Sequence, residues 1–355
     1  MPSLRSTSGP TMALASAALF GASTPLAKLL LGGGVDPWLL AGLLYLGSGV
    51  GLGILHLIRR MMGIAAAEAP LNRADLPWLA LVVLSGGVVG PLLLMIGLSS
   101  TPASTAALLL NVEGFATLAI AWVVFKENVD RRLLLGAFAI LAGAIVLSWQ
   151  GGPAGVGIGA IAIIGACIAW GIDNNLTRKL SAADPMQIAM IKGLAAGAVN
   201  LTLAFAHGAR VPAVPELAAA GVIGFLSYGV SLVLFVLALR YLGSARTGAY
   251  FSTAPFIGAV LAVVLFGEPV TGQLVIAAIL MGIGLFLHLA ERHDHQHVHE
   301  AMEHAHRHIH DEHHQHEHGP DDASGEPHVH VHKHQPMTHR HPHYPDLHHR
   351  HGHIH

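Results

Sequence analysis

One long apolar stretch, residues 103–127 (ASTAALLLNVEGFATLAIAWVVFKE), most constrains what this chain can fold into. It is long enough for the roughly 20-residue helix that crosses the ~30 Å hydrocarbon core of a bilayer. Two polar residues, Asn111 and Glu113, interrupt it near its middle. A carboxylate at that depth is costly in lipid, so we expect it to face a bundle interior or a water-filled cavity.

Similar apolar stretches recur along the first 290 residues, separated by short connections rich in Gly and Pro. Charged residues make up only 11% of the chain, against an average of about 25% in soluble domains. The sequence therefore predicts an all-α integral membrane protein with ten transmembrane helices. They are expected at 10–31, 36–58, 76–98, 103–125, 132–149, 156–177, 186–207, 216–239, 245–267 and 271–290.

The two halves of this apolar region resemble each other. Residues 115–127 match residues 256–268 at a constant offset, and each match ends in an acid, Glu127 and Glu268. Phe20-Gly21, followed by Lys28, corresponds to Trp170-Gly171. Two halves of five helices each must cross the membrane in opposite directions, which is an arrangement typical of secondary transporters. We therefore predict two inverted five-helix repeats, residues 1–150 and 151–290.

Residues 291–355 have a different composition, because they hold 24 of the 27 histidines. A polar, low-complexity segment of this kind buries too little apolar surface to fold alone, so a disordered tail is expected. Apart from Lys192, the Lys and Arg of the first 290 residues fall mostly on the side of the N-terminus, eleven against two. This bias predicts that the N-terminus and the tail both lie in the cytoplasm.

The chain resembles EamA-type carriers of the drug/metabolite transporter superfamily. The resemblance rests on the two five-helix halves, the aromatic-Gly pair in the first helix of each half, and the Phe-x-Glu that ends each fourth helix. It implies a multi-pass transporter of the bacterial inner (cytoplasmic) membrane that moves small metabolites, often outward, and that is not an enzyme. Family members usually carry Pro in the fourth helix of each half; here Pro255 holds that place and Gly114 replaces it in the first half.

Glu113 and its neighbours are the first candidates for function. Glu113 lies ~15 Å into its span, where a carboxylate suits coupling to a proton or another cation. The alternative is a structural ion pair with a basic residue such as Lys192. Asn111 lies about 200° around a continuous helix from Glu113, so the two are not expected to share a face.

A second set of candidates lies in the later spans. Asp173, Asn174 and Asn175 end the sixth span, where they are expected either to coordinate substrate or to be solvated at the interface with an Asp173–Arg178 ion pair. Lys192 is placed to bind substrate or to extend toward the interface. Tyr228 and Tyr250 are amphipathic candidates for ligand contact, with packing as the alternative.

The tail pattern favours metal binding. Imidazole suits divalent Ni, Zn, Co and Cu ions, and no fixed spacing indicates a single closed site. A pH-responsive polyelectrolyte is the alternative. The candidate metal ligands are His293, His295, His297, His299, His304, His306, His308, His310, His313, His314, His316, His318, His328, His330, His332 and His334.

Two functions remain open at this stage. The first is secondary active transport of a small metabolite, with efflux as the direction that the resemblance favours and a metal-binding tail. The second is export of a divalent transition metal sensed by the tail. A membrane sensor built on a carrier scaffold is a third class, and no feature of the spans favours it.

The expected partners are the lipid bilayer and a small molecule or ion. No cofactor is required, and no basic patch indicates nucleic acid. Whether the chain forms a homodimer stays open.

Overall fold

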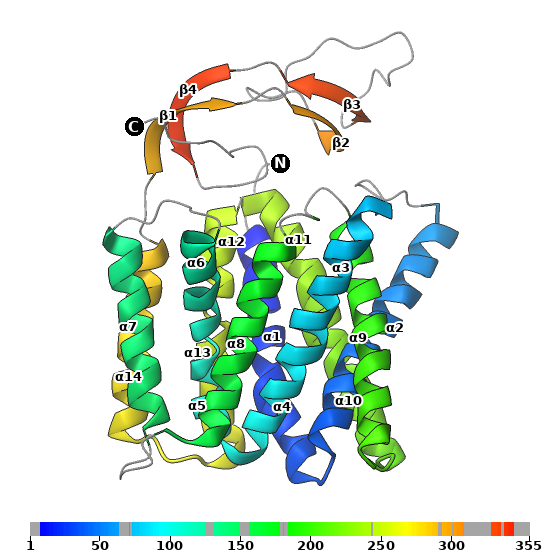
Figure 1. Cartoon of the computed structure of the whole chain (residues 1–355), viewed down its shortest axis with the longest axis vertical. Coiled ribbons are helices and arrows are strands. Elements are labelled where there is room, and N and C mark those ends of the chain that lie inside the picture. The colour runs from blue at the N-terminus through cyan, green and yellow to red at the C-terminus, as the bar shows by residue number, and fades with distance from the viewer. Residues whose placement is uncertain are drawn as a thin grey trace.

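The structure is a computed structural model of the 355-residue chain. It describes residues 8–63, 71, 73–124, 131–149, 156–177, 180, 184–242, 244–289, 293–299, 302–308, 328–334 and 337–343. The first ranges, up to residue 289, form a bundle of helices that run roughly along one axis (Figure 1).

The elements of the bundle follow one another without strands inside it. In chain order they are α1 (Ser8–Gly32), α2 (Pro37–Met61), the 3-10 turn η1 (Arg73–Asp75), α3 (Leu76–Val82), the π-helical segment η2 (Val83–Val89), α4 (Gly90–Ser100), α5 (Ala103–Leu109), α6 (Val112–Val123), α7 (Arg131–Ser148), α8 (Ile158–Thr177), α9 (Pro185–Ala206), α10 (Val214–Gly224), the π-helical segment η4 (Phe225–Val230), α11 (Ser231–Leu242), α12 (Ser244–Phe251), α13 (Ala254–Phe266) and α14 (Gly272–Leu289).

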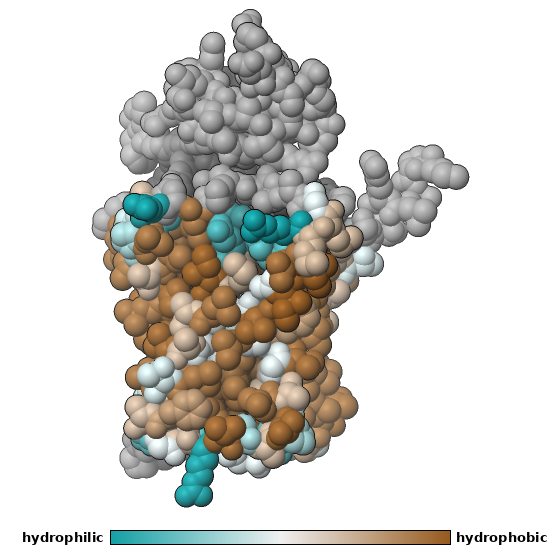
Figure 2. Space-filling model, turned by 90° about the vertical axis from the view of Figure 1, so that its right-hand side faces the viewer, coloured by the Kyte–Doolittle hydropathy of each residue, from teal (hydrophilic) through white to brown (hydrophobic). Residues whose placement is uncertain are grey.

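The outside of the bundle is apolar. Among the described residues, eight helical segments are long and apolar enough to cross a membrane, and two shorter apolar helices, Ala254–Phe266 and Gly272–His288, follow them. Figure 2 shows a broad band of hydrophobic side chains on the flank, with hydrophilic residues near its two ends. An apolar surface of this extent on a soluble protein would aggregate, so the bundle is a multi-pass membrane protein.

One Asp-Pro pair begins the second helix of each half, α2 and α9. Asp36 accepts hydrogen bonds from the amides of Trp38 (2.9 Å) and Leu39 (3.0 Å), and Asp184 accepts one from Met186 (2.8 Å). Each Asp satisfies amides that lack partners within the helix, and the Pro that follows needs none. The sequence therefore fixes where α2 and α9 start.

The fourth and ninth spans are each broken in the middle. Residues Leu110 and Asn111 separate α5 from α6, and Ser252 and Thr253 separate α12 from α13. Both were predicted as spans, and Ala103–Val123 is long and apolar enough to be one, but the break inside each was not predicted. No Pro lies at Leu110 or Asn111; the break coincides with the Asn111 side chain donating to the carbonyl of Leu108 (2.8 Å), a bond that competes with the helical pattern.

Close helix contacts hold the bundle together. α2 packs along α9, α7 packs along α14, α1 contacts α11 and α13, and α8 contacts α4 and α6. Glycines permit the tightest approach: a Cβ added to Gly49 would lie 2.4 Å from the backbone nitrogen of Leu194, and one added to Gly193 would lie 2.7 Å from Gly49. Small residues at the α2–α9 contact thus let the two backbones approach closely, as is common between helices in lipid.

The tail contains four short strands, so the predicted disorder does not hold for these segments. β1 (His293–His299) pairs antiparallel with β4 (Met337–His343), and β2 (Met302–His308) pairs antiparallel with β3 (His328–His334). The physical reason is that His at every second position has the period of a strand. The register sets His293 opposite His343 and His304 opposite His332.

Candidate functional site

A cavity of about 410 Å³ lies inside the bundle, between helices from both halves of the chain. Its charged lining side chains among the described residues are Glu113, Asp173 and Lys192. The rest of its wall is mostly aromatic and small polar side chains. Its volume is within the range of pockets that hold small organic molecules.

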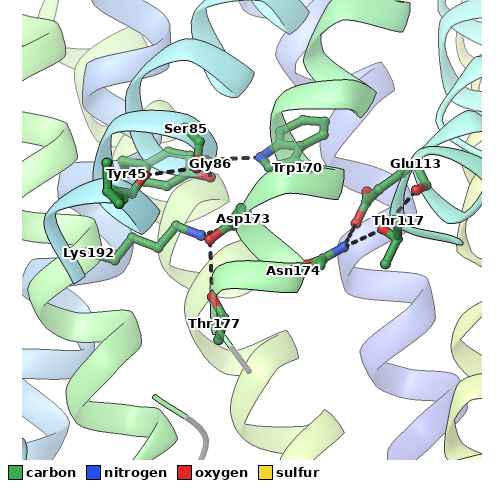
Figure 3. Close-up of polar contacts among 11 residues, drawn as sticks. Tyr45, Ser85, Gly86, Glu113, Thr117, Trp170, Asp173, Asn174, Thr177 and Lys192 are labelled. Atoms are coloured by element: carbon green, nitrogen blue, oxygen red, sulfur yellow. Dashed lines mark hydrogen bonds and ion pairs between the residues drawn. The ribbon is translucent and has the colours of Figure 1, made fainter. Parts of the chain in front are cut away.

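An ion pair between α8 and α9 forms one side of the cavity. The ammonium group of Lys192 contacts Oδ2 of Asp173, and the hydroxyl of Thr177 donates to Oδ1 of Asp173 at 3.2 Å (Figure 3). The side chain of Asp173 is only 7% exposed and that of Lys192 is 18% exposed. Asp173 is therefore buried and paired with Lys192, which corrects the interfacial position of Asp173 and the Glu113–Lys192 pair considered from the sequence. Arg178, the other partner considered for Asp173, lies outside the described residues.

Glu113 forms another side of the cavity, from the first turn of α6. Its Oε1 accepts a hydrogen bond from Nδ2 of Asn174 at 3.0 Å, and the same amide group donates to the hydroxyl of Thr117 at 3.1 Å. Thr117 in turn donates to the backbone carbonyl of Glu113 at 2.9 Å. This triangle, visible in Figure 3, ties α8 to α6 and fixes the direction of the Glu113 carboxylate.

The backbone carbonyl of Gly86, in η2, is a shared acceptor beside the ion pair. The hydroxyl of Tyr45 donates to it at 2.8 Å and the indole of Trp170 at 2.9 Å. In a regular α-helix this carbonyl would accept from the amide of Gly90, but in the π-turn that amide bonds to the carbonyl of Ser85. The next residue, Pro91, has no N–H, so the Gly86 carbonyl is left for side chains. Gly86 is also needed for space, since a Cβ there would lie 2.0 Å from Oδ2 of Asp173.

A row of aromatic rings covers the remaining wall. The ring centroids of Tyr45 and Tyr228 are 5.5 Å apart, those of Tyr228 and Phe20 are 5.9 Å apart, and those of Phe20 and Phe251 are 5.3 Å apart. Phe235 continues the row at 4.9 Å from Phe251. These tilted and edge-on contacts are the favourable ones for aromatic pairs, so the wall is well ordered.

The comparison with protein families decides the class of this molecule. The profile of the EamA-like transporter family matches the chain twice, over residues 7–149 and 157–290. The chain belongs to the EamA-like transporter family. It is a multi-pass membrane transporter, and proteins of this class are not in general enzymes.

Relatives and a solved structure agree with the family assignment. The EamA-like chain is 28% identical to an uncharacterized transporter of Methanothermobacter thermautotrophicus, over 76% of this chain and 82% of that protein. It is also 28% identical to a probable terminal-alkyne amino-acid exporter of Streptantibioticus cattleyicolor, over 62% of this chain and 78% of that protein. A crystal structure with 20% identity superposes with a TM-score of 0.57, covering 80% of this chain and 96% of the other, which shows a shared fold.

Five of the predicted site residues of this EamA-like protein line the cavity: Glu113, Asp173, Asn174, Lys192 and Tyr228. The other three do not. Asn111 is buried at the helix break, Asn175 donates to the carbonyls of Thr117 (3.0 Å) and Gly171 (2.8 Å), and Tyr250 is absent from the cavity lining among the described residues. Asn111 and Asn175 hold backbone turns together instead of facing the cavity.

The sequence did not reveal several cavity residues. Tyr45, Ser48, Phe235 and Phe251 resemble ordinary core residues. Gly86, which bonds to the cavity residues Tyr45 and Trp170, has no side chain to notice. Phe20 and Trp170 were singled out only as matching positions of the two halves. Their equivalence was a usable signal, because an aromatic residue in each first helix points to a shared wall of one cavity.

The metal prediction for the tail is left as a prediction. In the described part of the chain, no three His, Cys, Asp or Glu side chains come together as a metal site. Eleven of the sixteen candidate histidines belong to the strands of the tail, whereas His310, His313, His314, His316 and His318 lie outside the described residues.

A larger cavity of about 910 Å³ lies near the ends of α5, α7 and α14. Glu268 is the charged residue of its lining, and both of its carboxylate oxygens are already engaged at the start of α5, by the amides of Ala103 (2.7 Å) and Ser104 (2.9 Å). A carboxylate used in this way caps a helix. We therefore assign the functional site to the smaller, charged cavity.

Proposed function

We propose that this chain is a secondary active transporter that carries a small organic metabolite through the 410 Å³ cavity by alternating access, in the direction of efflux. The observation that carries the proposal is the pair of carboxylates and the lysine buried inside a membrane bundle. Ionisable groups at such depth are costly and are retained at substrate and ion pathways. The direction is suggested by the relative that is named as an exporter.

An inverted repeat of ten helices supports alternating access. The break at Leu110–Asn111 in the first half corresponds to that at Ser252–Thr253 in the second, and the π-segments η2 and η4 also match at nearly the same offset. The first helix of each half contacts the third and fourth spans of the other half: α1 contacts α11 and α13, and α8 contacts α4 and α6. Two equivalent halves of opposite orientation can exchange roles and open one site to alternate sides.

Contacts within the first half and one contact between the halves favour closure at the end of the bundle where α4 meets α5. The ammonium of Lys28 donates to the carbonyls of Leu98 (2.6 Å), Ser99 (3.2 Å) and Thr101 (3.0 Å) at the end of α4, and Glu268 caps the start of α5. Both charges have the sign that the helix ends favour. We infer that these contacts hold α4 and α5 together beside the 910 Å³ cavity at this end, and that the smaller cavity is reached from the N-terminal side.

Metal export is the weaker alternative. A divalent ion requires several oxygen or nitrogen ligands around one point. In the cavity, the ammonium of Lys192 contacts one of the two carboxylates, and no cluster of three candidate ligands exists among the described residues. An organic substrate fits this wall better, since most of it is aromatic or apolar.

Filling the cavity tests the proposal. Ala189 lines the cavity on α9, so Ala189→Trp should reduce uptake into proteoliposomes more than ~10-fold by excluding the substrate. Ala198→Trp, on the exposed face of the same helix, should transport like the wild type. The panel is phenylalanine, phenylethylamine, phenylpropionate and Ni²⁺. Uptake of Ni²⁺ alone would favour the metal alternative, and organic uptake that survives Ala189→Trp would contradict the cavity route.

Both termini are proposed to lie in the cytoplasm of a bacterial cell, with the bundle in the inner membrane. Reporter fusions after residue 63, which follows α2, and after α14 should both show cytoplasmic activity, because of the Lys and Arg bias. A fusion after Arg210, between α9 and α10, should show periplasmic activity. Periplasmic activity at either of the first two positions would contradict the inverted repeat.

The tail is proposed to bind divalent metal as a separate module of the transporter. The full-length protein should take up several Ni²⁺ or Zn²⁺ ions at neutral pH and release them near pH ~5, because imidazoles must lose their protons to act as ligands. Calorimetry on the full chain and on a chain ending at Leu289 measures this difference. Equal uptake by both chains would remove the metal role of the tail and leave the polyelectrolyte alternative.

A further inference from the structure

We propose that the cavity selects a small organic cation, a protonated amine with an apolar body, which binds Glu113 through its ammonium group and the aromatic wall through its body. The inference rests on the proposed function, since it names the substrate class of the same cavity. It follows from three features: the net charge of the cavity lining, the number of hydrogen bonds that each charged group can still make to a ligand, and the aromatic surface.

The lining carries a net negative charge. Its charged side chains among the described residues are two carboxylates, Glu113 and Asp173, and one ammonium, Lys192. Two negative charges and one positive charge leave a formal sum of −1. A cation of single charge therefore neutralises the cavity, whereas an anion would raise its charge to −2 in a poorly solvated place.

Lys192 is not available for an anionic substrate. Its ammonium contacts Oδ2 of Asp173, and this partner is held from the other side by Thr177. A substrate carboxylate would have to displace Asp173, which is 7% exposed and would then be a buried charge without a cation. The pair thus acts as a neutral part of the wall.

The carboxylate of Glu113 can accept further hydrogen bonds. Its Oε1 receives a single hydrogen bond from the neutral amide of Asn174, and no described residue donates a hydrogen bond to its Oε2. A carboxylate can accept about four hydrogen bonds. Because Asn174 and Thr117 fix the orientation of the group, its unused acceptors face a ligand in the cavity without rearrangement.

The aromatic wall suits the rest of such a ligand. Phe20, Phe251 and Phe235 present a continuous surface with centroid separations of 5.3 Å and 4.9 Å. The faces of aromatic rings attract cations, and their area buries apolar groups. A volume of about 410 Å³ leaves room for one compact molecule of this kind.

Three probes with one phenyl body and different charges test the inference. They are phenylethylamine, the zwitterion phenylalanine and the anion phenylpropionate, added to full-length protein in lipid nanodiscs with chelator at neutral pH. Calorimetry should give phenylethylamine a Kd at least ~10-fold lower than that of phenylalanine, and should show no binding of phenylpropionate. The ammonium gains a charge-assisted hydrogen bond to Glu113, whereas the carboxylate of the other two probes is repelled there, and a hydrogen bond of this kind changes Kd by about 10-fold or more. This ranking uses the wild-type chain and needs no variant.

A variant pair then assigns the ammonium to Glu113. Glu113→Gln should weaken binding of phenylethylamine about 10- to 100-fold. Asp36→Asn removes a carboxylate outside the cavity and keeps its helix cap, so it should bind like the wild type. Should the Gln variant not fold, Asn174→Ala, which frees Glu113 from its orienting bond, is expected to weaken the same probe.

The outcomes separate this inference from the transport proposal. Equal or tighter binding of phenylalanine or phenylpropionate, or binding of none of the probes, overturns the cation selectivity. Transport of an organic compound blocked by Ala189→Trp would still support the cavity route in that case. Conversely, amine binding that depends on Glu113 with no flux would uphold the inference and contradict the transport proposal.

Discussion

Replacing Lys192 with Met is expected to destabilise the folded protein by about 3–5 kcal/mol, because it leaves Asp173 as a buried charge without its cation. Asp173 is 7% exposed, and the other hydrogen bond that it accepts within the described residues, from Thr177, is uncharged. Met has nearly the length of the Lys stem, so packing beside Gly87 in η2 is largely kept. The expected result is a low yield of monodisperse protein and a lower unfolding temperature.

A second change should reverse this loss. In the double variant Asp173→Asn with Lys192→Met no unpaired charge is left, so yield and unfolding temperature should return toward those of the wild type. Asp173→Asn alone should be less harmful than Lys192→Met alone, because Lys192 is more exposed and can extend toward water. A Lys192→Met protein as stable as the wild type would show that the pair does not hold α8 to α9.

Gly86→Ala is expected to have the second large effect, a destabilisation of about 1–3 kcal/mol together with loss of transport. The added methyl group would lie 2.0 Å from Oδ2 of Asp173, so either the carboxylate or η2 must move. Movement of the carboxylate breaks the contact with Lys192. Movement of η2 shifts the Gly86 carbonyl away from Tyr45 and Trp170.

Gly114→Ala is the matched control. A Cβ at Gly114 would have no atom within 4 Å, and the residue lies in the helical part of α6 next to Glu113. Alanine there should leave folding unchanged or improve it by about 0.5–1 kcal/mol, since it favours the helix more than glycine does. Thermal unfolding and vesicle uptake of both variants decide the point, and similar behaviour of the two would contradict the tight contact at Gly86.

The sequence allowed much of the fold to be predicted, because hydropathy, length and Asp-Pro caps act locally. The spans that begin at Asp36-Pro37 and Asp184-Pro185 are clear examples. The breaks at Leu110 and Ser252 could not be predicted in this way. Whether a carbonyl bonds along its own helix or with a side chain depends on neighbouring helices. An Asn in an apolar span, such as Asn111, does not by itself predict a helix break.

The site was predictable by residue type but not by pairing. Buried Glu113, Asp173 and Lys192 are conspicuous in an apolar chain, and all three line the cavity. Their partners depend on how α8 and α9 are rotated against each other, and the hydrophobic periodicity of the sequence does not give this rotation. For this reason the sequence offered a Glu113–Lys192 pair only as an alternative, while the structure pairs Lys192 with Asp173 and bonds Glu113 to Asn174.

We propose that substrate and a coupling proton use the carboxylate of Glu113 in turn, which joins the coupling role that the sequence suggested for Glu113 with the amine site inferred from the cavity. The direct measurement is the flux of phenylethylamine in proteoliposomes under an imposed pH gradient, for the wild type and Glu113→Gln, with Asp36→Asn as the control. The charged groups facing the same cavity, Asp173 and Lys192, stay in all three proteins. We predict that the Gln variant folds but loses gradient-driven flux and its dependence on pH. A folded Gln variant with unaltered flux and unaltered pH dependence would contradict the account.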